Sequence, residues 1–389
     1  MAKERSTTFF RANDWWIGKA STLLMLVYLY SYLLQIPFEK FIWLGAVSLV
    51  VIIGFASFGY LTNDWFDQEQ DALAGKKNIF QGKSRFIRLC YFLIAFILIV
   101  VPWLVLPFNT KSIALIFIEL SLFLIYSVPP IRLKEKNYFG LLVDALYAHA
   151  VPAYFALHTF QLAAGKSLPL YFVVFLMLWQ FFIGFRNIMI HQINDTEEDK
   201  KAGVRNWSAE IEVNKVWIAV HSIVTVEVLL LLYIIYFAFG SIQKLQLISL
   251  AVLLFFFFVY VLYHKTKRYF FSAFVNWVNF PNFYYEYFLS VITFTTLIIY
   301  DKSYFILVGF HVVLFFIPAI ISTIKLIFGI YLSIPFFGLF LTCFYIPIRR
   351  LISFIVNISI YYLFIIFGVD LIKEKMSAAD YLKRKRNKK

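Results

Sequence analysis

Membrane-length apolar runs recur along the whole chain and restrict its fold more than any other feature. A helix needs about 20 apolar residues to cross a bilayer, and lipid offers no partner to unpaired backbone groups, so such runs fold as helices. The predicted spans are residues 20–36, 41–62, 89–107, 112–129, 140–160, 168–192, 214–239, 246–264, 282–300, 304–324, 327–347 and 351–371. Stretches such as LLLLYIIYFAF do not alternate as barrel strands would. The sequence therefore predicts an all-α polytopic membrane protein.

The distribution of positive charge predicts how the chain is oriented. With the N-terminus in the cytoplasm, 19 Lys and Arg fall in the N-terminal segment and the cytoplasmic loops, and 4 fall in the opposite loops. This asymmetry follows the positive-inside rule. We therefore expect an integral protein of the plasma or inner membrane, with its N-terminus and the polar loops near 63–88 and 193–213 in the cytoplasm. The basic tail YLKRKRNKK is read as solvated, with contact to anionic lipid as the alternative. No nucleic-acid partner is expected.

A cluster of acids directly follows the second span, in the stretch YLTNDWFDQEQDA. Insertion of an aspartate at the centre of a bilayer costs roughly 2.5–3.5 kcal/mol. A cluster of acids directly next to an apolar span is therefore expected to have a structural or functional role. Asn63, Asp67 and Asp71 are spaced four apart, which places them on one face of a helix. Asp64 lies beside them. The pattern predicts a row of oxygen ligands at the end of this span.

A second cluster follows the sixth span, in HQINDTEEDKKAG, where Asp195 and Asp199 repeat the spacing of four. Carboxylates stacked in this way repel one another unless a cation lies between them. Hard oxygen ligands with one or two carboxylates per ion are typical of Mg²⁺ rather than zinc. A solvated helix end is the alternative for either cluster alone, and it is favoured for Glu69, Glu197 and Glu198. Two clusters with matching spacing and sidedness favour two Mg²⁺ sites with a polyanion between them.

Lysines lie near both clusters and indicate what the polyanion is. They are Lys76 and Lys77 after the first cluster, Lys134 after the fourth span, and Lys200 and Lys201 in the second cluster. A diphosphate suits two metal sites and several lysines, and an apolar helical cavity suits a hydrocarbon tail. The residues therefore predict an isoprenoid diphosphate as substrate, with its head at the cytoplasmic edge.

Three segments of the chain resemble motifs of the UbiA superfamily of intramembrane aromatic and lipid prenyltransferases. NDWFDQEQD is similar to the family's NDxxDxxxD signature, and DTEEDKKAG resembles its second DxxxDxxxG motif. Between them, YSVPPIRLKEK resembles the family's YxxxK segment, with Tyr126 and Lys134, in a wording closest to the chlorophyll-synthase and homogentisate-prenyltransferase branches. The resemblance covers residues from about 10 to 300. Many relatives carry Arg-Pro after the first motif where this chain has GKKNIFQGKSR, so which lysine replaces that arginine is open.

The resemblance implies a nine-helix bundle around a central cavity, capped by the motif loops. It implies Mg²⁺ ligands at Asn63, Asp64, Asp67, Asp71, Asp195 and Asp199. It implies catalytic roles for Asp67, Asp71, Asp195, Asp199, Tyr126 and Lys134. Lys134, with Lys77 or Lys200, would bind the diphosphate, and Tyr126 would lie near the reacting allylic carbon. We expect this bundle over residues 1–300, additional transmembrane helices over 301–371, and a basic cytoplasmic tail over 372–389.

Four polar residues inside spans are candidates for the acceptor side of the site. Asn187 and His191 share a helical face with Asp195 by spacing of four, so both are predicted to bind substrate, although a structural histidine at a helix end is an equal alternative. Asp144 and His149 are ionisable groups within the fifth span, which by default suggests function. Their spacing of five does not place them quite on one face.

The sequence thus favours a Mg²⁺-dependent prenyltransferase that moves an isoprenyl group from a prenyl diphosphate to a lipophilic acceptor and releases diphosphate. The wording of YSVPPIRLK favours an aromatic or ring-containing acceptor. Two other enzymes fit the same motifs: a terpene cyclase of this fold, and an enzyme that transfers phosphoribose to a polyprenyl phosphate. A cation-coupled transporter is the alternative outside enzymes, but it predicts acids near the middle of the membrane rather than at span ends.

Overall fold

The computed structural model describes residues 19–73, 75–201, 213–266 and 280–313. The chain forms one unit of residues 1–267 and 277–312 and a second of residues 268–276 and 313–389. The helices below belong to the first unit. The additional helices and tail predicted after residue 313 lie outside the described residues. The predicted domain boundaries at residues 300 and 371 therefore stay predictions.

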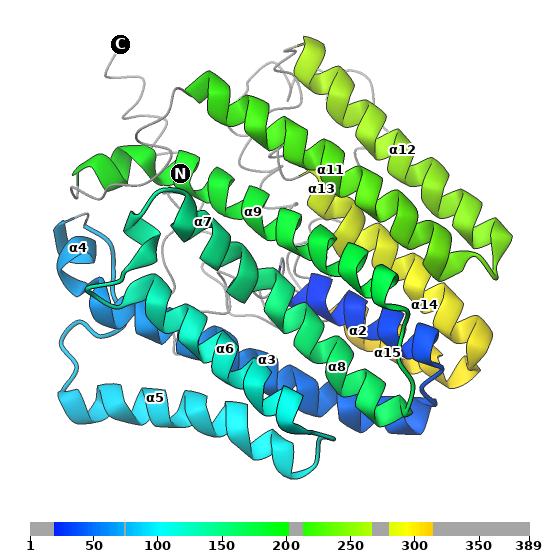
Figure 1. Cartoon of the computed structure of the whole chain (residues 1–389), viewed down its shortest axis with the longest axis horizontal. Helices are drawn as coiled ribbons and strands as arrows, with labels where there is room; N and C mark the ends of the chain where they lie inside the picture. Colours follow the sequence, from blue (N-terminus) through cyan, green and yellow to red (C-terminus); the bar gives the residue numbers. More distant parts are fainter. Residues whose placement is uncertain (1–18, 74, 202–212, 267–279, 314–389) are drawn as a thin grey trace, which may run out of the picture. The chain divides into compact units, whose positions relative to one another are not determined.

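All regular secondary structure among the described residues is helical, and no strand occurs among them. In chain order the elements are α2 (Ser21–Leu34), α3 (Phe38–Phe66), α4 (Gln68–Leu73), α5 (Arg85–Val100), η2 (Val101–Leu104), α6 (Thr110–Ser127), η3 (Leu133–Glu135), α7 (Tyr138–Ala145), η4 (Leu146–Ala150), α8 (Val151–Ala164), α9 (Leu170–Lys201), α11 (Val213–Phe239), α12 (Gln243–Thr266), α13 (Phe280–Phe283), η7 (Tyr284–Phe288), α14 (Leu289–Tyr300), η8 (Lys302–Tyr304) and α15 (Phe305–His311). Figure 1 shows the long helices side by side.

Six of these helical segments are long and apolar enough to cross a membrane: Phe38–Phe66, Arg85–Leu104, Thr110–Ser127, Tyr138–Ala164, Leu170–Ile193 and Lys215–Phe239. Two shorter apolar helices, α2 and the first half of α12, coincide with the first and eighth predicted spans. The broken helix α13–η7–α14 coincides with the ninth. The prediction of an all-helical polytopic membrane protein is confirmed.

Local sequence signals set several helix ends. Asn109 precedes α6 and forms a capping box with Ser112: the Asn109 side chain accepts from the Ser112 N–H, and the Ser112 hydroxyl accepts from the Asn109 N–H, both at 3.2 Å. Such reciprocal bonds satisfy N–H groups that the first helical turn leaves unpaired. Gly165 ends α8 in the left-handed conformation, with φ of 62°, which costs glycine no steric strain.

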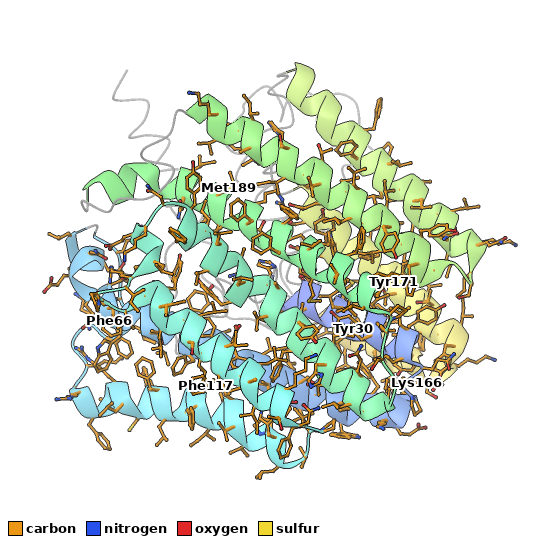
Figure 2. The ribbon with its side chains drawn as sticks, viewed as in Figure 1. Tyr30, Phe66, Phe117, Lys166, Tyr171 and Met189 are labelled. Atoms are coloured by element: carbon orange, nitrogen blue, oxygen red, sulfur yellow. The ribbon has the colours of Figure 1, made fainter. Side chains whose placement is uncertain are left out.

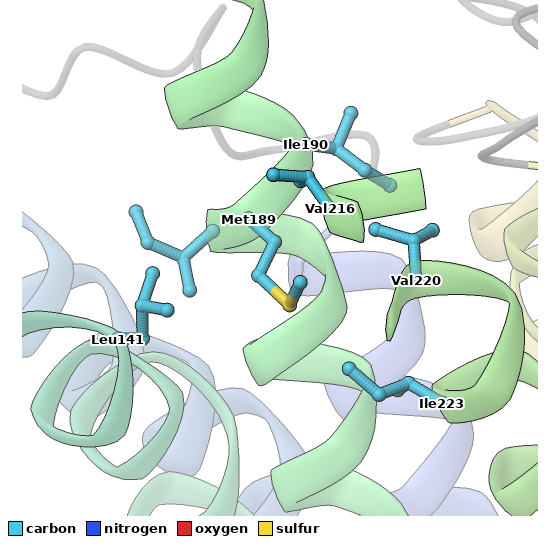
Figure 3. Close-up of a cluster of buried hydrophobic side chains, with 7 residues drawn as sticks. Leu141, Met189, Ile190, Val216, Val220 and Ile223 are labelled. Carbon is cyan, nitrogen blue, oxygen red and sulfur yellow. The ribbon is translucent and has the colours of Figure 1, made fainter. Parts of the chain in front are cut away.

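Apolar side chains both fill the space between helices and face outward. One buried cluster joins α7, α9 and α11 through residues that include Leu141, Met189 and Val220 (Figure 3). Tyr30 on α2 is fully buried, whereas Phe117 on α6 is 73% exposed (Figure 2). A large aromatic side chain that is exposed on an apolar helix is what a lipid-facing surface requires.

The helices that carry the acid motifs end together. The C-terminal ends of α3 and α9, the segment after α6, and α4 all lie at the left end in Figure 1. Both motif helices also run further than predicted: α3 ends at Phe66 rather than near residue 62, and α9 ends at Lys201 rather than near residue 192. Glu and Lys are good helix formers, and DTEEDKK contains no glycine or proline, so the end of the apolar run does not end the helix.

Candidate active site

The first acid motif lies where α3 passes into α4, with Asp67 between the two helices. Helical hydrogen bonds continue through this junction: the Asp67 N–H donates to the Asn63 carbonyl at 3.0 Å, and the Asp71 N–H donates to the Asp67 carbonyl at 2.8 Å. The spacing of four therefore does place Asn63, Asp67 and Asp71 along one face. Asp64, Asp67 and Asp71 are all buried, so these acids are not a solvated helix end.

Two cations hold Asp67. Its Oδ1 atom accepts from Nη2 of Arg132 at 2.8 Å and forms a short ion pair with the ammonium of Lys134. The same Lys134 ammonium donates to Oδ1 of Asn63 at 2.8 Å, and the hydroxyl of Ser127 donates to that atom at 3.3 Å. The structure thus brings together three predicted site residues, with the Lys134 ammonium between the Asn63 and Asp67 oxygens. Their functional roles stay predictions.

Sequence reasoning did not select Arg132, although it lies in the quoted segment YSVPPIRLKEK. Its backbone is left-handed, with φ of 39°, a conformation that costs a side-chain-bearing residue about 1–3 kcal/mol. Its guanidinium also donates to Oε1 of Glu135 at 2.5 Å and to the Phe66 and Ser127 carbonyls at 3.2 and 3.3 Å. These contacts hold the strained turn in place and join it to the ends of α3 and α6.

The turn η3 positions Lys134, and burial alters its acidity. A side chain at Gly140, on α7, would place its Cβ 2.9 Å from the Leu133 carbonyl oxygen and 3.0 Å from Cα of Lys134. Only glycine allows α7 to pack this closely on η3. Burial lowers the pKa of Lys134, and the negative charge of Asp67 opposes that shift without cancelling it. A buried lysine with one acidic partner is suited to binding a further anion.

Asn78 is a second residue that sequence reasoning missed. Its amide nitrogen donates to Oδ2 of Asp71 and to the Asp64 carbonyl, each at 2.8 Å, and its side-chain oxygen accepts from the Phe80 N–H at 2.9 Å. For the loop GKKNIFQGKSR, the sequence predicts only that one of its lysines replaces the family's arginine. The sequence does contain one signal for Asn78: it directly precedes the apolar residues Ile79 and Phe80. These two residues are buried in a cluster with side chains of α3 and α5.

Aromatic rings lie next to this polar cluster, on the membrane side. Tyr126 directly precedes Ser127, and its ring contacts the Tyr147 ring with centroids 5.1 Å apart. The ring of Phe123 lies 4.8 Å from that of Tyr147. The Tyr147 hydroxyl donates to Oδ2 of Asp144 in a short hydrogen bond. Electron-rich ring faces of this kind stabilise a nearby cation by about 0.5–2 kcal/mol each.

The structure also describes three other predicted residues: Lys77, Asn187 and His191. Lys77 is exposed in the loop after α4, and His191 is exposed on α9. Asn187 accepts from the Asn282 amide at 3.5 Å. Because α9 is continuous, Asn187 and His191 do lie on the face that leads toward the second motif. Side chains of α9 are described only as far as residue 193, so the predictions for Asp195, Asp199 and Lys200 lie outside the described side chains.

The first motif fits a magnesium ion that is shared with a phosphate. Within the described residues no three His, Cys, Asp or Glu side chains converge as a metal cluster. Mg²⁺ does not need three, because it commonly takes one or two protein carboxylates and completes its shell with phosphate oxygens and water. The oxygens of Asn63 and Asp67 already share one cation, the Lys134 ammonium. These two oxygens are therefore a suitable donor set for Mg²⁺.

The fold and this site together define a polytopic helical membrane protein whose motif helices end in a buried cluster of acids and bases. The model described as the UbiA prenyltransferase family matches residues 20–280, and the chain belongs to this family. No curated protein sequence matches this chain.

Solved structures of a UbiA homologue from Archaeoglobus fulgidus share the fold. The form bound to DMAPP and Mg²⁺ is 15% identical, covers 71% of this chain and 95% of its own, and superposes with a TM-score of 0.50. The form bound to GPP and Mg²⁺ is 16% identical with the same coverage and TM-score. At this level of identity the likeness establishes the fold alone.

Proposed function

We propose that the protein is a Mg²⁺-dependent prenyltransferase, which moves an isoprenyl group from a prenyl diphosphate to a lipophilic, ring-containing acceptor and releases diphosphate. One observation carries the proposal: the Lys134 ammonium lies between the Asn63 and Asp67 oxygens, in a buried site at the end of α3. When a magnesium diphosphate binds, the two oxygens can exchange the ammonium for the metal ion. The ammonium can then pair with a phosphate oxygen. The DMAPP and GPP bound with Mg²⁺ in the Archaeoglobus homologue support it.

Different residues at the first motif would bind different parts of the donor. Asn63 and Asp67 would hold Mg²⁺, with Asp64 and Asp71 close by, and the ion would neutralise the charge that builds on the leaving diphosphate. Lys134, released from these oxygens, would pair with a phosphate oxygen. Arg132 keeps Asp67 in place during this exchange through a contact of 2.8 Å that does not involve Lys134.

The rings of Tyr126 and Tyr147 stabilise positive charge on the reacting carbon. As the carbon–oxygen bond to diphosphate breaks, its electron pair leaves with diphosphate and the allylic carbon becomes positive. Tyr126 and Tyr147 present rings beside the metal-binding residues, where they stabilise that charge and exclude water. An electron pair of the acceptor then forms the new bond, and the acceptor gives up the displaced proton to the released diphosphate. We assign Asp195 and Asp199 to a second Mg²⁺ on the other side of the diphosphate, with Lys77 or Lys200 as a further phosphate contact.

The proposed orientation in the membrane determines from which side each substrate reaches the site. We propose that the N-terminus and the motif segments face the cytoplasm of a plasma or inner membrane, as the asymmetry of Lys and Arg indicates. The diphosphate would then arrive from the aqueous side, while the prenyl chain and the acceptor remain in the apolar interior of the bundle.

Product analysis tests this proposal. The purified protein would be given Mg²⁺, prenyl diphosphates of increasing length and a membrane lipid extract, with diphosphate release and lipid masses followed together. Asp67→Asn and Asp195→Asn should each abolish release, while Glu39→Gln, an exposed acid at the opposite end of α3, should not. A product of acceptor plus prenyl mass supports transfer, and a cyclic hydrocarbon indicates a cyclase instead. Absence of release at every chain length contradicts the proposal and favours the phosphoribosyl or transporter alternatives.

A further inference from the structure

Arg186 and Glu227 form an ion pair inside the apolar part of the bundle. Glu227 lies at the middle of the membrane-length segment Lys215–Phe239 of α11, and Arg186 lies within the segment Leu170–Ile193 of α9. Both side chains are fully buried. The Arg186 guanidinium donates through Nε at 2.6 Å and through Nη2 at 3.1 Å to the two carboxyl oxygens of Glu227. The pair therefore joins two helices through two separate contacts.

Neighbouring polar side chains extend this pair into a network. The Tyr285 hydroxyl donates to Oε2 of Glu227 at 2.9 Å. Nη2 of Arg186 donates to Oδ1 of Asn282 at 2.6 Å, and the Asn282 amide donates to Asn187 at 3.5 Å. α9, α11 and the α13–η7 segment are thus joined by hydrogen bonds, each of which has a defined direction and partner.

Stability alone does not account for a charged pair at this depth. Removal of two charges from water is costly, and replacement of a buried pair by apolar side chains of similar size is often neutral or stabilising. Apolar side chains already pack α9 against α11, where Ile190 shares a buried cluster with Val216 and Val220 (Figure 3). An ion pair adds geometry, because it is favourable in only one alignment of its two helices, and setting the register of helices is the best-attested role of buried polar groups.

α9 is held on two opposite faces. Positions two apart on a helix are turned by about 200°, so Gly184 lies on the face of α9 opposite Arg186. A Cβ on Gly184 would lie 2.9 Å from Cα of Ala145 and 3.1 Å from the Ala145 carbonyl oxygen, so α9 passes close to the backbone at the end of α7. This close approach restricts the distance between α9 and α7, and the ion pair on the other face restricts the rotation of α9.

The rotation of α9 matters because the same helix carries the second acid motif. α9 runs without interruption from Leu170 to Lys201, so positions 195 and 199 turn together with Arg186. Position 195 is turned by about 180° from Arg186 and lies about 14 Å further along the helix. A rotation of about 20° would move a carboxylate that lies about 5 Å from the helix axis by about 2 Å. Residues that bind a ligand together have to be held to within about 0.5 Å.

We propose that the Arg186–Glu227 pair is a positioning contact, which fixes the rotation of α9 and so sets where the second acid motif lies relative to the diphosphate. Arg186, Glu227 and Tyr285 touch no reacting atom and act through Asp195 and Asp199. The inference rests on the proposed function, in which those two acids hold the second Mg²⁺. Loss of the pair should therefore lower donor affinity without a matching loss of stability.

Donor binding by a variant without either charge tests the inference. A non-hydrolysable prenyl thiodiphosphate would be titrated calorimetrically into the full-length protein in detergent with Mg²⁺. The double variant Arg186→Met, Glu227→Leu should keep most of the thermal stability of wild type, because no buried charge is left unpaired. It should nevertheless bind the thiodiphosphate at least about tenfold more weakly than wild type.

Two neighbouring tyrosines provide a milder test and its matched control. Tyr285→Phe removes one hydrogen bond to Glu227 and should weaken thiodiphosphate binding about fivefold. Tyr284 is buried as well, but its hydroxyl contacts Ser249 on α12, with 2.6 Å to the Ser249 hydroxyl and 3.0 Å to the Ser249 carbonyl. Tyr284→Phe should therefore bind within about twofold of wild type.

Removal of the second acid motif shows whether the effect passes through α9. In a background of Asp195→Asn and Asp199→Asn, which itself should bind the thiodiphosphate at least about tenfold more weakly than wild type, addition of the double variant should weaken binding by less than about twofold further. A role in general stability would instead weaken binding to the same extent in both backgrounds.

The outcomes separate failure of this inference from failure of the proposed function. Wild type that binds no thiodiphosphate contradicts the proposed function. Wild-type affinity in the Asp195→Asn, Asp199→Asn background contradicts the proposed second Mg²⁺ site, and this inference with it. The positioning role alone is overturned if the double variant binds as wild type does, or if it weakens binding about tenfold further in that background. If the double variant does not fold, equal affinity of Tyr285→Phe and Tyr284→Phe overturns the positioning role.

Discussion

Replacement of Arg132 by methionine tests whether this unpredicted residue holds the candidate active site together. Methionine keeps much of the side-chain volume but removes every hydrogen bond and the charge. Asp67 would then have Lys134 as its only ion-pair partner among the described residues. Glu135 would lose an ion pair and keep the bond of 3.0 Å from the Gln70 amide.

The magnitude follows from the burial of each pair. The side chains of Arg132 and Asp67 are 11% and 9% exposed, and removal of one partner of a buried pair costs about 3–5 kcal/mol. Because Lys134 still pairs with Asp67, the lower end applies. Glu135 is 32% exposed, so its pair adds at most about 1 kcal/mol. We expect Arg132→Met to lower the free energy of unfolding by about 3 kcal/mol.

Denaturant titration in detergent, followed by tryptophan fluorescence, measures these free energies. Arg88→Met is the matched control: the Arg88 guanidinium lies 5.7 Å from the ring centres of Trp65 and Phe80 and donates to Gln68 at 2.7 Å, outside the acid cluster. We expect this control to cost about 1 kcal/mol. An Arg132→Met variant no less stable than Arg88→Met would refute the reasoning about the buried pair.

Three further predictions concern pH, the Asn78 contacts and the second buried ion pair. Burial lowers the pKa of Lys134 from 10.5, so this residue should lose its charge, and wild type its donor affinity, as pH rises toward that value. Lys134→Arg should stay charged and keep its affinity over the same range. Binding titrations over about pH 7 to 10 check both expectations. Asn78→Ala should weaken donor binding about tenfold, because two of the three side-chain hydrogen bonds that it removes go to Asp64 and Asp71. Gln81→Ala, exposed in the same loop, should not weaken it, as calorimetry would show. Arg186→Met alone should destabilise the fold by about 3–5 kcal/mol, and addition of Glu227→Leu should restore much of this in thermal unfolding; equal instability of both variants contradicts it.

The helices of this protein were predictable because their cause is local. Each apolar run needs a partner for its backbone in lipid, and a helix provides it within the run. The positions where helices end were predicted less well, because polarity marks the membrane edge and not the helix terminus. α9 continues through Glu and Lys to Lys201 for this reason, and α3 carries its motif as far as Phe66.

The candidate site was predictable where spacing alone defines it. The interval of four puts Asn63 and Asp67 on one face, and the motif resemblance selected Lys134. Arg132 and Asn78 could not be selected in this way, because their contacts depend on the conformation of two irregular loops. Arg132 meets Asp67 across 65 residues of chain. Periodicity does not encode a contact of that kind.

The most direct test of the central claim is whether the first acid motif binds a prenyl diphosphate through Mg²⁺. Calorimetric titration of a non-hydrolysable prenyl thiodiphosphate into wild type and Asp67→Asn, each with and without Mg²⁺, measures this alone. We predict that Mg²⁺ tightens binding to wild type at least about tenfold, and that this effect is much smaller in Asp67→Asn, which keeps only the proposed second site at Asp195 and Asp199. Equal affinity with and without Mg²⁺ in wild type, or a Mg²⁺ effect as large in Asp67→Asn as in wild type, would contradict the account.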